Sequence, residues 1–177
     1  MRRIIGITVI ISLLATSLFA QIPRGKSDNK QGSTILNFGL GTSGWGVPIY
    51  IQGEQFFYKE LSIGIESTFR FSNEVVGNAT YHHNMIAIGG LCNYYFDKIA
   101  NLPPFVDLYS GVSAGFVHVS SSTSNSNVTY SGSRGSGLYL GLHVGGRYYF
   151  SDTWAAQMEL EFGTMLAGLK IGATYRF

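Results

Sequence analysis

Residues 138–163 read LYLGLHVGGRYYFSDTWAAQMELEFG, and this stretch decides the fold. On each side of the turn at Ser151–Thr153, large apolar residues alternate with small or polar ones. Leu138, Leu140, Leu142, Val144, Tyr148 and Phe150 alternate with Tyr139, Gly141, His143, Gly145 and Arg147, and Trp154, Ala156, Met158, Leu160 and Phe162 alternate with Ala155, Gln157, Glu159, Glu161 and Gly163. A period of two is the spacing of a β-strand with one apolar face. The stretch therefore predicts two antiparallel strands joined by a short turn.

The same alternation recurs through the rest of the chain from residue 33 onward. It predicts eight strands, at 36–40, 47–54, 61–71, 85–96, 106–116, 138–150, 154–163 and 169–177. The pattern is weakest in 85–96, where Met85 and Leu91 stand on the otherwise polar face. The segments are close to the roughly 9–11 residues that a tilted membrane strand needs. We expect an all-β, eight-stranded antiparallel up-and-down barrel over residues 33–177. Ten strands are the alternative, for which these residues leave little loop length.

Composition narrows the class of protein. The chain has 177 residues, enough for one domain, and only 12% of them are charged although 45% are hydrophobic and 14% aromatic. Disordered chains are rich in charge and poor in aromatic residues, so disorder is excluded. A disulfide scaffold is excluded as well, because Cys92 is the only cysteine.

The first 20 residues have the order of a cleaved secretory signal. Arg2 and Arg3 precede an apolar run, and small residues lead to Ala20. Residues 21–32 are polar and predict a flexible leader with no packed structure of its own. Without the signal, the chain has 10 basic and 10 acidic residues, because the signal carries two of the 12 basic residues and none of the 10 acids. We therefore expect an exported protein that does not bind nucleic acid.

Three features favour a membrane barrel over a soluble one. The polar faces carry mostly Gly, Ser, Thr, Asn and Tyr, which suit the narrow interior of an eight-stranded barrel. The apolar faces run without charges, as lipid contact requires. Aromatic groups at 56–58, 94–96 and 148–150, with Phe105, Trp154, Tyr175 and Phe177, all fall at one end of the strands. Such an aromatic belt marks a membrane interface, here the periplasmic one.

The connections between strands are unequal in length. The turns expected at the periplasmic end are mostly short, whereas residues 72–82 and 120–136 are longer and polar. Short inner turns and long outer loops are usual in membrane barrels. We expect 72–82 and 120–136 to be surface loops available to a surface ligand.

The YYFSDTW turn at 148–154 and the terminal Tyr175-Arg176-Phe177 complete a family resemblance. Residues 33–177 resemble the small outer-membrane β-barrel domain proteins of Gram-negative bacteria, the OmpA/OmpX-like group of the porin family. The resemblance implies a location in the outer membrane, in contact with lipid and lipopolysaccharide. It also implies that Phe177 is read by the barrel assembly machinery. We expect a monomer.

The polar faces carry charges of both signs: Glu54, Glu66, Asp107, Glu159, Glu161, Arg70, Arg147, Lys170 and Arg176, with His143 among them. We interpret them as an ion-pair network that fills the barrel, because unpaired buried charges are costly. This favours a structural or surface-interaction role of the adhesion type. The alternative is a narrow porin-like channel for small solutes.

Enzymatic chemistry has weaker support. His118 and Ser120 share a strand face and, with a carboxylate such as Glu74, resemble the triad of outer-membrane lipid A deacylases. The longer motif of that family is not matched, so a lipid A-modifying enzyme is the third candidate. His82 and His83 are adjacent and point to opposite faces of a strand, so they do not share a metal ion. We expect no enzyme activity and assign no catalytic, cofactor-binding or metal-binding residue.

Overall fold

The computed structural model describes residues 25–27, 29–44, 46–76, 79–123 and 135–177; the side chains of 73–76, 79–81 and 121–123 are outside this description, and so is the expected signal at 1–20. The described residues form eight strands: β1 (Thr34–Thr42), β2 (Val47–Tyr58), β3 (Leu61–Val76), β4 (Ala79–Tyr95), β5 (Val106–Thr123), β6 (Gly137–Tyr149), β7 (Trp154–Gly163) and β8 (Gly168–Arg176). They contain no helix with the length and apolarity needed to span a membrane.

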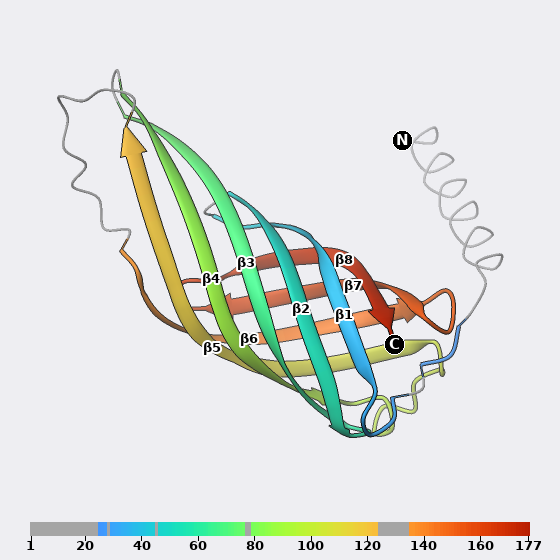
Figure 1. Ribbon diagram of the computed structural model, residues 1–177. Helices are drawn as coiled ribbons and strands as arrows, with labels where there is room; N and C mark the ends of the chain where they lie inside the picture. The colour runs from blue at the N-terminus through green and yellow to red at the C-terminus, as the bar shows by residue number, and fades with distance from the viewer. Residues whose placement is uncertain (1–24, 28, 45, 77–78, 124–134) are drawn as a thin grey trace, which may run out of the picture.

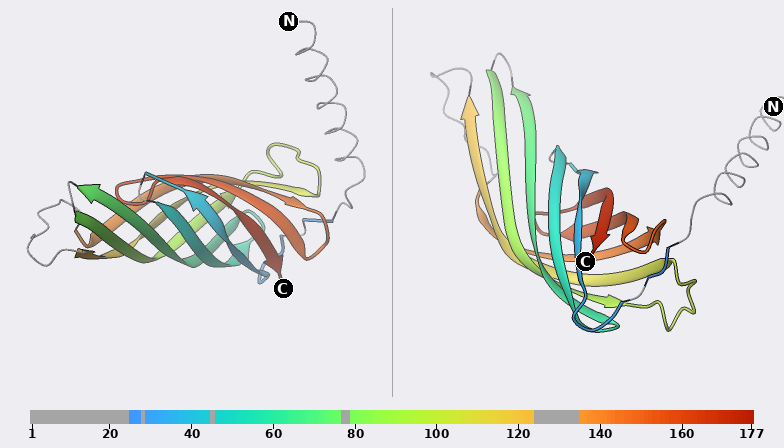
Figure 2. Two further views of the ribbon diagram at one scale, coloured as in Figure 1. Left: turned by 90° about the horizontal axis from the view of Figure 1, so that it is seen from above. Right: turned by 45° about the vertical axis from the view of Figure 1, so that its right-hand side comes forward.

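The eight strands form a closed antiparallel barrel in which each strand pairs with the next along the chain (Figure 1). The barrel is closed by β1 and β8, whose register places Phe38 opposite Ala173 and Leu40 opposite Ile171. The predicted fold class and strand number are confirmed. The strands cross the barrel obliquely (Figure 2, left), as closure of a sheet into a barrel requires.

The polarity of the barrel is the reverse of that of a soluble protein. Leu138 is 82% exposed and Ile65 72% exposed on the outer wall, whereas Glu54 and Arg147 are 2% exposed inside. The outward face of every strand is mainly apolar, and the inward face carries most of the buried polar and charged side chains. An apolar surface of this extent is stable in contact with lipid and not with water. The apolar outer wall and the buried charges therefore agree with the predicted membrane barrel.

Strands β3, β4 and β5 are longer than the others and project beyond them as a three-stranded sheet (Figure 2, right). This corrects the expectation of surface loops at 72–82 and 120–136. Residues 72–76 pair with 79–83, and 120–123 pair with 81–84, so these parts are strand. The sequence of these parts is mostly polar and its apolar residues Val75 and Val76 are adjacent, so no alternation marks them, yet the backbone ladder continues. Residues 77–78 and 124–134 lie outside the described part.

The predicted aromatic belt lies at the end of the barrel where both β1 begins and β8 ends, which we call the periplasmic end. Rings pack in pairs there, with centroids 4.9 Å apart for Trp154 and Tyr175 and 5.0 Å apart for Tyr175 and Phe177. Three further aromatic residues of the predicted belt instead point into the barrel and are buried: Phe56, Tyr95 and Tyr149. Because successive side chains of a strand point to opposite faces of the sheet, a run of consecutive aromatic residues places rings both outside and inside the barrel.

The expected leader is also corrected for its described part. Residues 25–27 and 29–32 form neither helix nor strand, but they hydrogen-bond to the barrel instead of standing free. Gly25 N–H donates to the Tyr149 carbonyl at 3.0 Å, and Gly32 N–H donates to the Phe56 carbonyl at 2.8 Å. The leader therefore packs across the periplasmic end.

We expect Ile65→Arg to destabilise the barrel by about 2–4 kcal/mol, the cost of an arginine on the lipid face near the bilayer midplane. Ile65 lies in the middle of β3 and faces outward. The free energy of unfolding of the barrel refolded into lipid vesicles, followed by tryptophan fluorescence in guanidinium, measures the effect. Thr153→Arg, in an exposed periplasmic turn, is the control and should change little. An Ile65→Arg variant as stable as the original chain would contradict a lipid-facing wall.

Candidate functional site

The buried charges predicted from the sequence come together inside the barrel, beginning with Glu54 on β2. Its carboxylate accepts a 2.6 Å charge-assisted bond from Arg147 on β6. It also accepts hydrogen bonds from Asn37, Ser62, Asn93 and Tyr95 at 2.7, 2.7, 2.9 and 2.9 Å. The carboxylate thus has five donors from four strands. Such multiple donors replace the water that a buried carboxylate loses.

Arg147 is held between aromatic rings as well as by Glu54. Its guanidinium lies 4.3 Å from the centroid of the Tyr109 ring and 5.5 Å from that of Tyr95. It also donates to the Tyr95 hydroxyl at 2.5 Å. Because guanidinium groups stack on aromatic faces, the two tyrosines hold the arginine in one orientation.

A second layer lies nearer the outer end, around Lys170 on β8. Its ammonium contacts Glu66 at 3.0 Å, Glu159 at 3.1 Å and Glu161 at 3.1 Å. Gln52 donates to both Glu66 and Glu159 at 3.2 Å. One cation therefore serves three carboxylates, so Lys170 links strands β3, β7 and β8.

Tyrosine hydroxyls and glycines complete the interior. The Tyr109 hydroxyl donates to Glu159 at 2.9 Å, and the Tyr139 hydroxyl donates to Glu66 at 3.0 Å. Each ring lies over a glycine: a Cβ atom at Gly145 would overlap Tyr109, and one at Gly89 would overlap Tyr139. The glycines on the inner faces thus provide the room that the tyrosines occupy, as predicted for a narrow interior.

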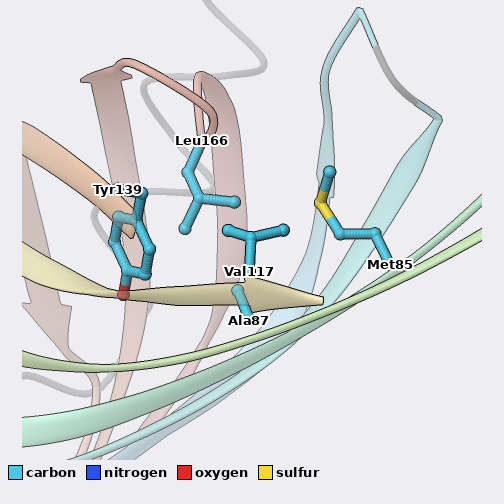
Figure 3. Packing of buried hydrophobic residues seen from close by; sticks show 5 residues of the cluster. All are labelled: Met85, Ala87, Val117, Tyr139 and Leu166. Carbon is cyan, nitrogen blue, oxygen red and sulfur yellow. The ribbon is translucent and has the colours of Figure 1, made fainter. Parts of the chain in front are cut away.

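The outer end of the interior is closed by an apolar cluster (Figure 3). Met85, Ala87, Val117 and Tyr139 pack with Leu166, which is fully buried although it lies in the turn between β7 and β8. This turn folds its leucine inward over the barrel. This apolar cluster therefore lies at the outer end of the charged layers.

The structure places His118 and Ser120 of the proposed triad on one strand face and the backbone of Glu74 away from them. His118 and Ser120 share the outward face of β5, as predicted, but the His118 Nδ1 atom lies 3.3 Å from Ser136 Oγ instead. Glu74 pairs with Tyr81, which pairs with Thr123, five positions along β5 from His118. Five residues of strand span about 16 Å. The backbone of Glu74 is therefore remote from that of His118.

The two adjacent histidines face opposite sides of β4, as predicted. His83 is buried inside the barrel and His82 is exposed. Within the described part of the chain, no three His, Cys, Asp or Glu side chains form a group suited to hold a metal ion. The structure thus gives no reason to assign a metal ligand among these residues.

Sequence reasoning found the charges of the interior but missed their neutral partners. Asn37, Gln52 and Asn93 each donate to a buried glutamate, and the alternation places all three on inner faces. The alternation in the sequence could have identified these partners, because an amide side chain on an inward face needs a hydrogen-bond partner there. Leu166 gave no such signal, since it lies in a turn outside any alternating segment.

We expect Glu54→Gln to lower the free energy of unfolding by about 3–5 kcal/mol, because it leaves the Arg147 charge buried without a counter-charge. Equilibrium unfolding in lipid vesicles measures the loss. Glu60→Gln, whose carboxylate is part-exposed and 4.0 Å from Lys98, is the control and should cost less than about 1 kcal/mol. A Glu54→Gln variant within the range of this control would show that the pair does not stabilise the barrel.

Comparisons with known proteins support the fold. No protein-family model matches the sequence, and the comparison with curated proteins gives no match. Among solved structures, the chain is similar to the outer membrane protein OprG of Pseudomonas aeruginosa, with 12% identity, a TM-score of 0.64, and 86% of this chain and 99% of that chain covered.

Two further similar structures have surface-related names. One is Ail, the attachment invasion locus protein of Yersinia pestis, solved with the heparin analogue sucrose octasulfate (16% identity, TM-score 0.56, 83% and 99% covered). The other is Neisserial surface protein A (14% identity, TM-score 0.53, 81% and 93% covered). At these identities the likeness concerns the fold. The chain has the fold of a small bacterial outer-membrane β-barrel.

Proposed function

We propose that the chain is an outer-membrane protein whose filled barrel anchors a projecting sheet for contact at the cell surface. The projecting sheet is the part of β3, β4 and β5 formed by residues 72–76, 79–84 and 118–123. This sheet is the observation that carries the proposal. Its outward end lies opposite the periplasmic end, where both ends of the barrel chain lie (Figure 2).

The projecting sheet has two edges without a strand partner among the described residues. Pairing of β2 with β3 ends at Val47 and Phe71, and pairing of β5 with β6 ends at Val117 and Gly137. An edge strand with unpaired backbone groups is a template for an added strand. The β5 edge reads HVSSST over residues 118–123. Its Val119 N–H donates to Ser136 Oγ at 2.9 Å, and the edge has no proline or lysine to block pairing beyond that point. An extended peptide segment is therefore the partner that this sheet fits.

The interior supports an anchor in preference to a channel. Glu54, Arg147 and Lys170 are engaged in short contacts, and the apolar cluster around Leu166 covers the outer end. An eight-stranded barrel has an interior just wide enough for its own side chains. Passage of a solute would require several buried ion pairs to separate.

The remaining expectations belong to the same proposal. The apolar outer wall fits the acyl chains of outer-membrane lipid and lipopolysaccharide. Phe177 is 72% exposed at the periplasmic end, where the barrel assembly machinery would have access to it. The proposed unit is a monomer, and no enzymatic activity is proposed for it. The attachment role in the name of Ail, a protein of the same fold, is in line with a surface role.

Attachment tests the proposed function directly. A non-adherent Gram-negative bacterium that expresses the chain should attach to epithelial cell layers several-fold more than the same strain with an empty vector. A shortened variant, with residues 72–83 and 118–136 each replaced by a two-residue turn, should return attachment to the vector level. Lys59→Ala, in the β2–β3 turn at the other end of the barrel, is the control and should attach like the original chain.

The original chain, the shortened variant and Lys59→Ala must each first show a folded barrel by a difference in gel migration between boiled and unboiled samples. Attachment at the vector level by the original chain, or full attachment by the shortened variant, would overturn the proposal.

Planar-bilayer recording tests the channel alternative. We expect no discrete conductance steps from the purified barrel, because the charged layers fill the interior. Glu159→Ala with Glu161→Ala removes two of the three carboxylates at Lys170 and serves as the comparison. Regular steps from the original chain that change in size or ion selectivity in the double variant would favour a narrow channel instead.

A further inference from the structure

The exposed positive charge of the described part of the chain lies at one end of the barrel. Its exposed basic side chains belong to the leader and to the periplasmic turns: Lys26, Lys30, Lys59 and Lys98. The other basic side chains of this part are buried in the barrel interior. Lysines close to a membrane surface attract lipids with anionic headgroups. The periplasmic rim therefore suits an anionic headgroup of the membrane leaflet on that side.

Two of these lysines, Lys26 and Lys30, stand at a cavity of about 320 Å³ beside the end of β8. The cavity is lined by Lys26, Lys30, Ser33, Asp152, Arg176 and Phe177. The Lys26 N–H donates to Asp152 at 2.9 Å, and the Lys26 carbonyl accepts from Arg176 at 3.1 Å. The Lys30 carbonyl accepts the Ser33 N–H at 3.0 Å and the Ser33 hydroxyl at 2.7 Å. Both lysine side chains therefore extend from backbone positions that hydrogen bonds hold at the cavity.

The cavity has an excess of positive charge. Its lining includes three basic side chains and one acidic side chain, that of Asp152. The charge of Arg176 is partly balanced by Asp107, which lies 3.9 Å from its Nη2 atom. The side chains of Lys26 and Lys30 are exposed. Because an ammonium group binds phosphate as a compact point charge, these two lysines are the groups suited to a phosphate in the cavity.

A chain of aromatic rings leads from this cavity onto the lipid-facing wall. Phe177 lines the cavity, and its ring centroid lies 5.0 Å from that of Tyr175. The Tyr175 centroid lies 4.9 Å from that of Trp154. Trp154 in turn lies 6.3 Å from Phe38 on β1. Tyrosine and tryptophan rings favour the depth at which headgroups meet acyl chains. The rings therefore mark the place where a lipid with its phosphate in the cavity would enter the bilayer.

Beyond the rings, an open apolar groove of about 490 Å³ follows the seam where β1 pairs with β8. Its side chains on the outer wall are those of Phe38, Leu40, Thr42, Leu169, Ile171 and Ala173. Ala173 stands opposite Phe38 on one side and opposite Ala156 of β7 on the other. Two small side chains thus adjoin between larger ones and leave a depression in the wall. The groove begins at Phe38, where the chain of rings ends, so it lies where an acyl chain would continue.

We propose that the seam of β1 and β8 is a binding site for one anionic phospholipid of the periplasmic leaflet. The ammonium groups of Lys26 and Lys30 hold its phosphate, and one acyl chain passes the aromatic rings and lies in the groove. A lipid fits better than a soluble anion, because the charged cavity and the apolar groove are joined by the rings. This inference uses the location in the membrane and does not depend on the surface role proposed above.

Quenching of Trp154 fluorescence by brominated lipid tests the proposal. Trp45 is the only other tryptophan of the chain, and Trp45→Phe leaves Trp154 as the reporter. The barrel is refolded into phosphatidylcholine vesicles that contain a small fraction of phosphatidylglycerol brominated on its acyl chains. We expect this anionic lipid to quench Trp154 more than the same fraction of brominated phosphatidylcholine does. Equal quenching by the two lipids would overturn the proposal.

Paired lysine variants separate a site from general attraction to the rim. Lys26→Ala with Lys30→Ala should lower the preference for the anionic lipid by up to about 25-fold, since each lysine near a membrane surface contributes about fivefold. Lys59→Ala with Lys98→Ala removes the same charge from the same end of the barrel, away from the seam, and should keep the preference. An equal loss in the two double variants would overturn the proposed site.

A third variant tests the groove while both lysines remain. Ala173→Leu fills the depression at the seam, so it should also lower the preference for the anionic lipid. Ala114→Leu, on the outward face of β5, adds the same side chain elsewhere on the wall and should change nothing. Full preference in Ala173→Leu would contradict binding of the acyl chain in the groove. Gel migration of boiled and unboiled samples checks that each barrel is folded.

Discussion

A carboxylate without access to water must find its partners within the protein, and in this barrel that constraint shapes the whole interior. Glu54, on β2, receives hydrogen bonds from side chains on β1, β3, β4 and β6. No local segment supplies this set, because each strand offers only alternate residues to the inside. The donors meet only when the barrel closes. The free energy of the Glu54 site is therefore tied to closure, and a strand out of register by one residue would turn its donors toward lipid.

The sequence was sufficient for the wall and for the list of inward charges, because both follow from a period of two. It was insufficient for pairings such as Lys170 with Glu66, which lie 104 residues apart. Such contacts depend on the stagger of strands around the barrel, and alternation does not specify stagger. The extension of β3 to Val76 escaped prediction for a different reason. Above the lipid, neither face must be apolar, so the backbone can continue as strand without any periodic signal.

The glycines and tyrosines of the interior are best understood as one packing unit. Gly89 and Gly145 remove the side chains that would overlap Tyr139 and Tyr109, and the two hydroxyl groups then reach Glu66 and Glu159. A smaller residue in place of either tyrosine would leave a carboxylate without one of its donors, whereas a larger residue in place of either glycine would displace the tyrosine ring. At these positions glycine and tyrosine thus have a common physical cause.

The two ends of the barrel are closed by different kinds of contact, and the difference bears on how each end behaves. At the outer end, Leu166 sits in a short turn and packs on Met85, Ala87, Val117 and Tyr139; this contact involves no charge and is insensitive to pH. At the periplasmic end, Lys26, Ser27 and Asn29 of the leader donate hydrogen bonds to Asp152, Asp107 and Asp97 in turn. The outer end is therefore covered by apolar packing, whereas the periplasmic end is covered by a polar segment that is held by hydrogen bonds.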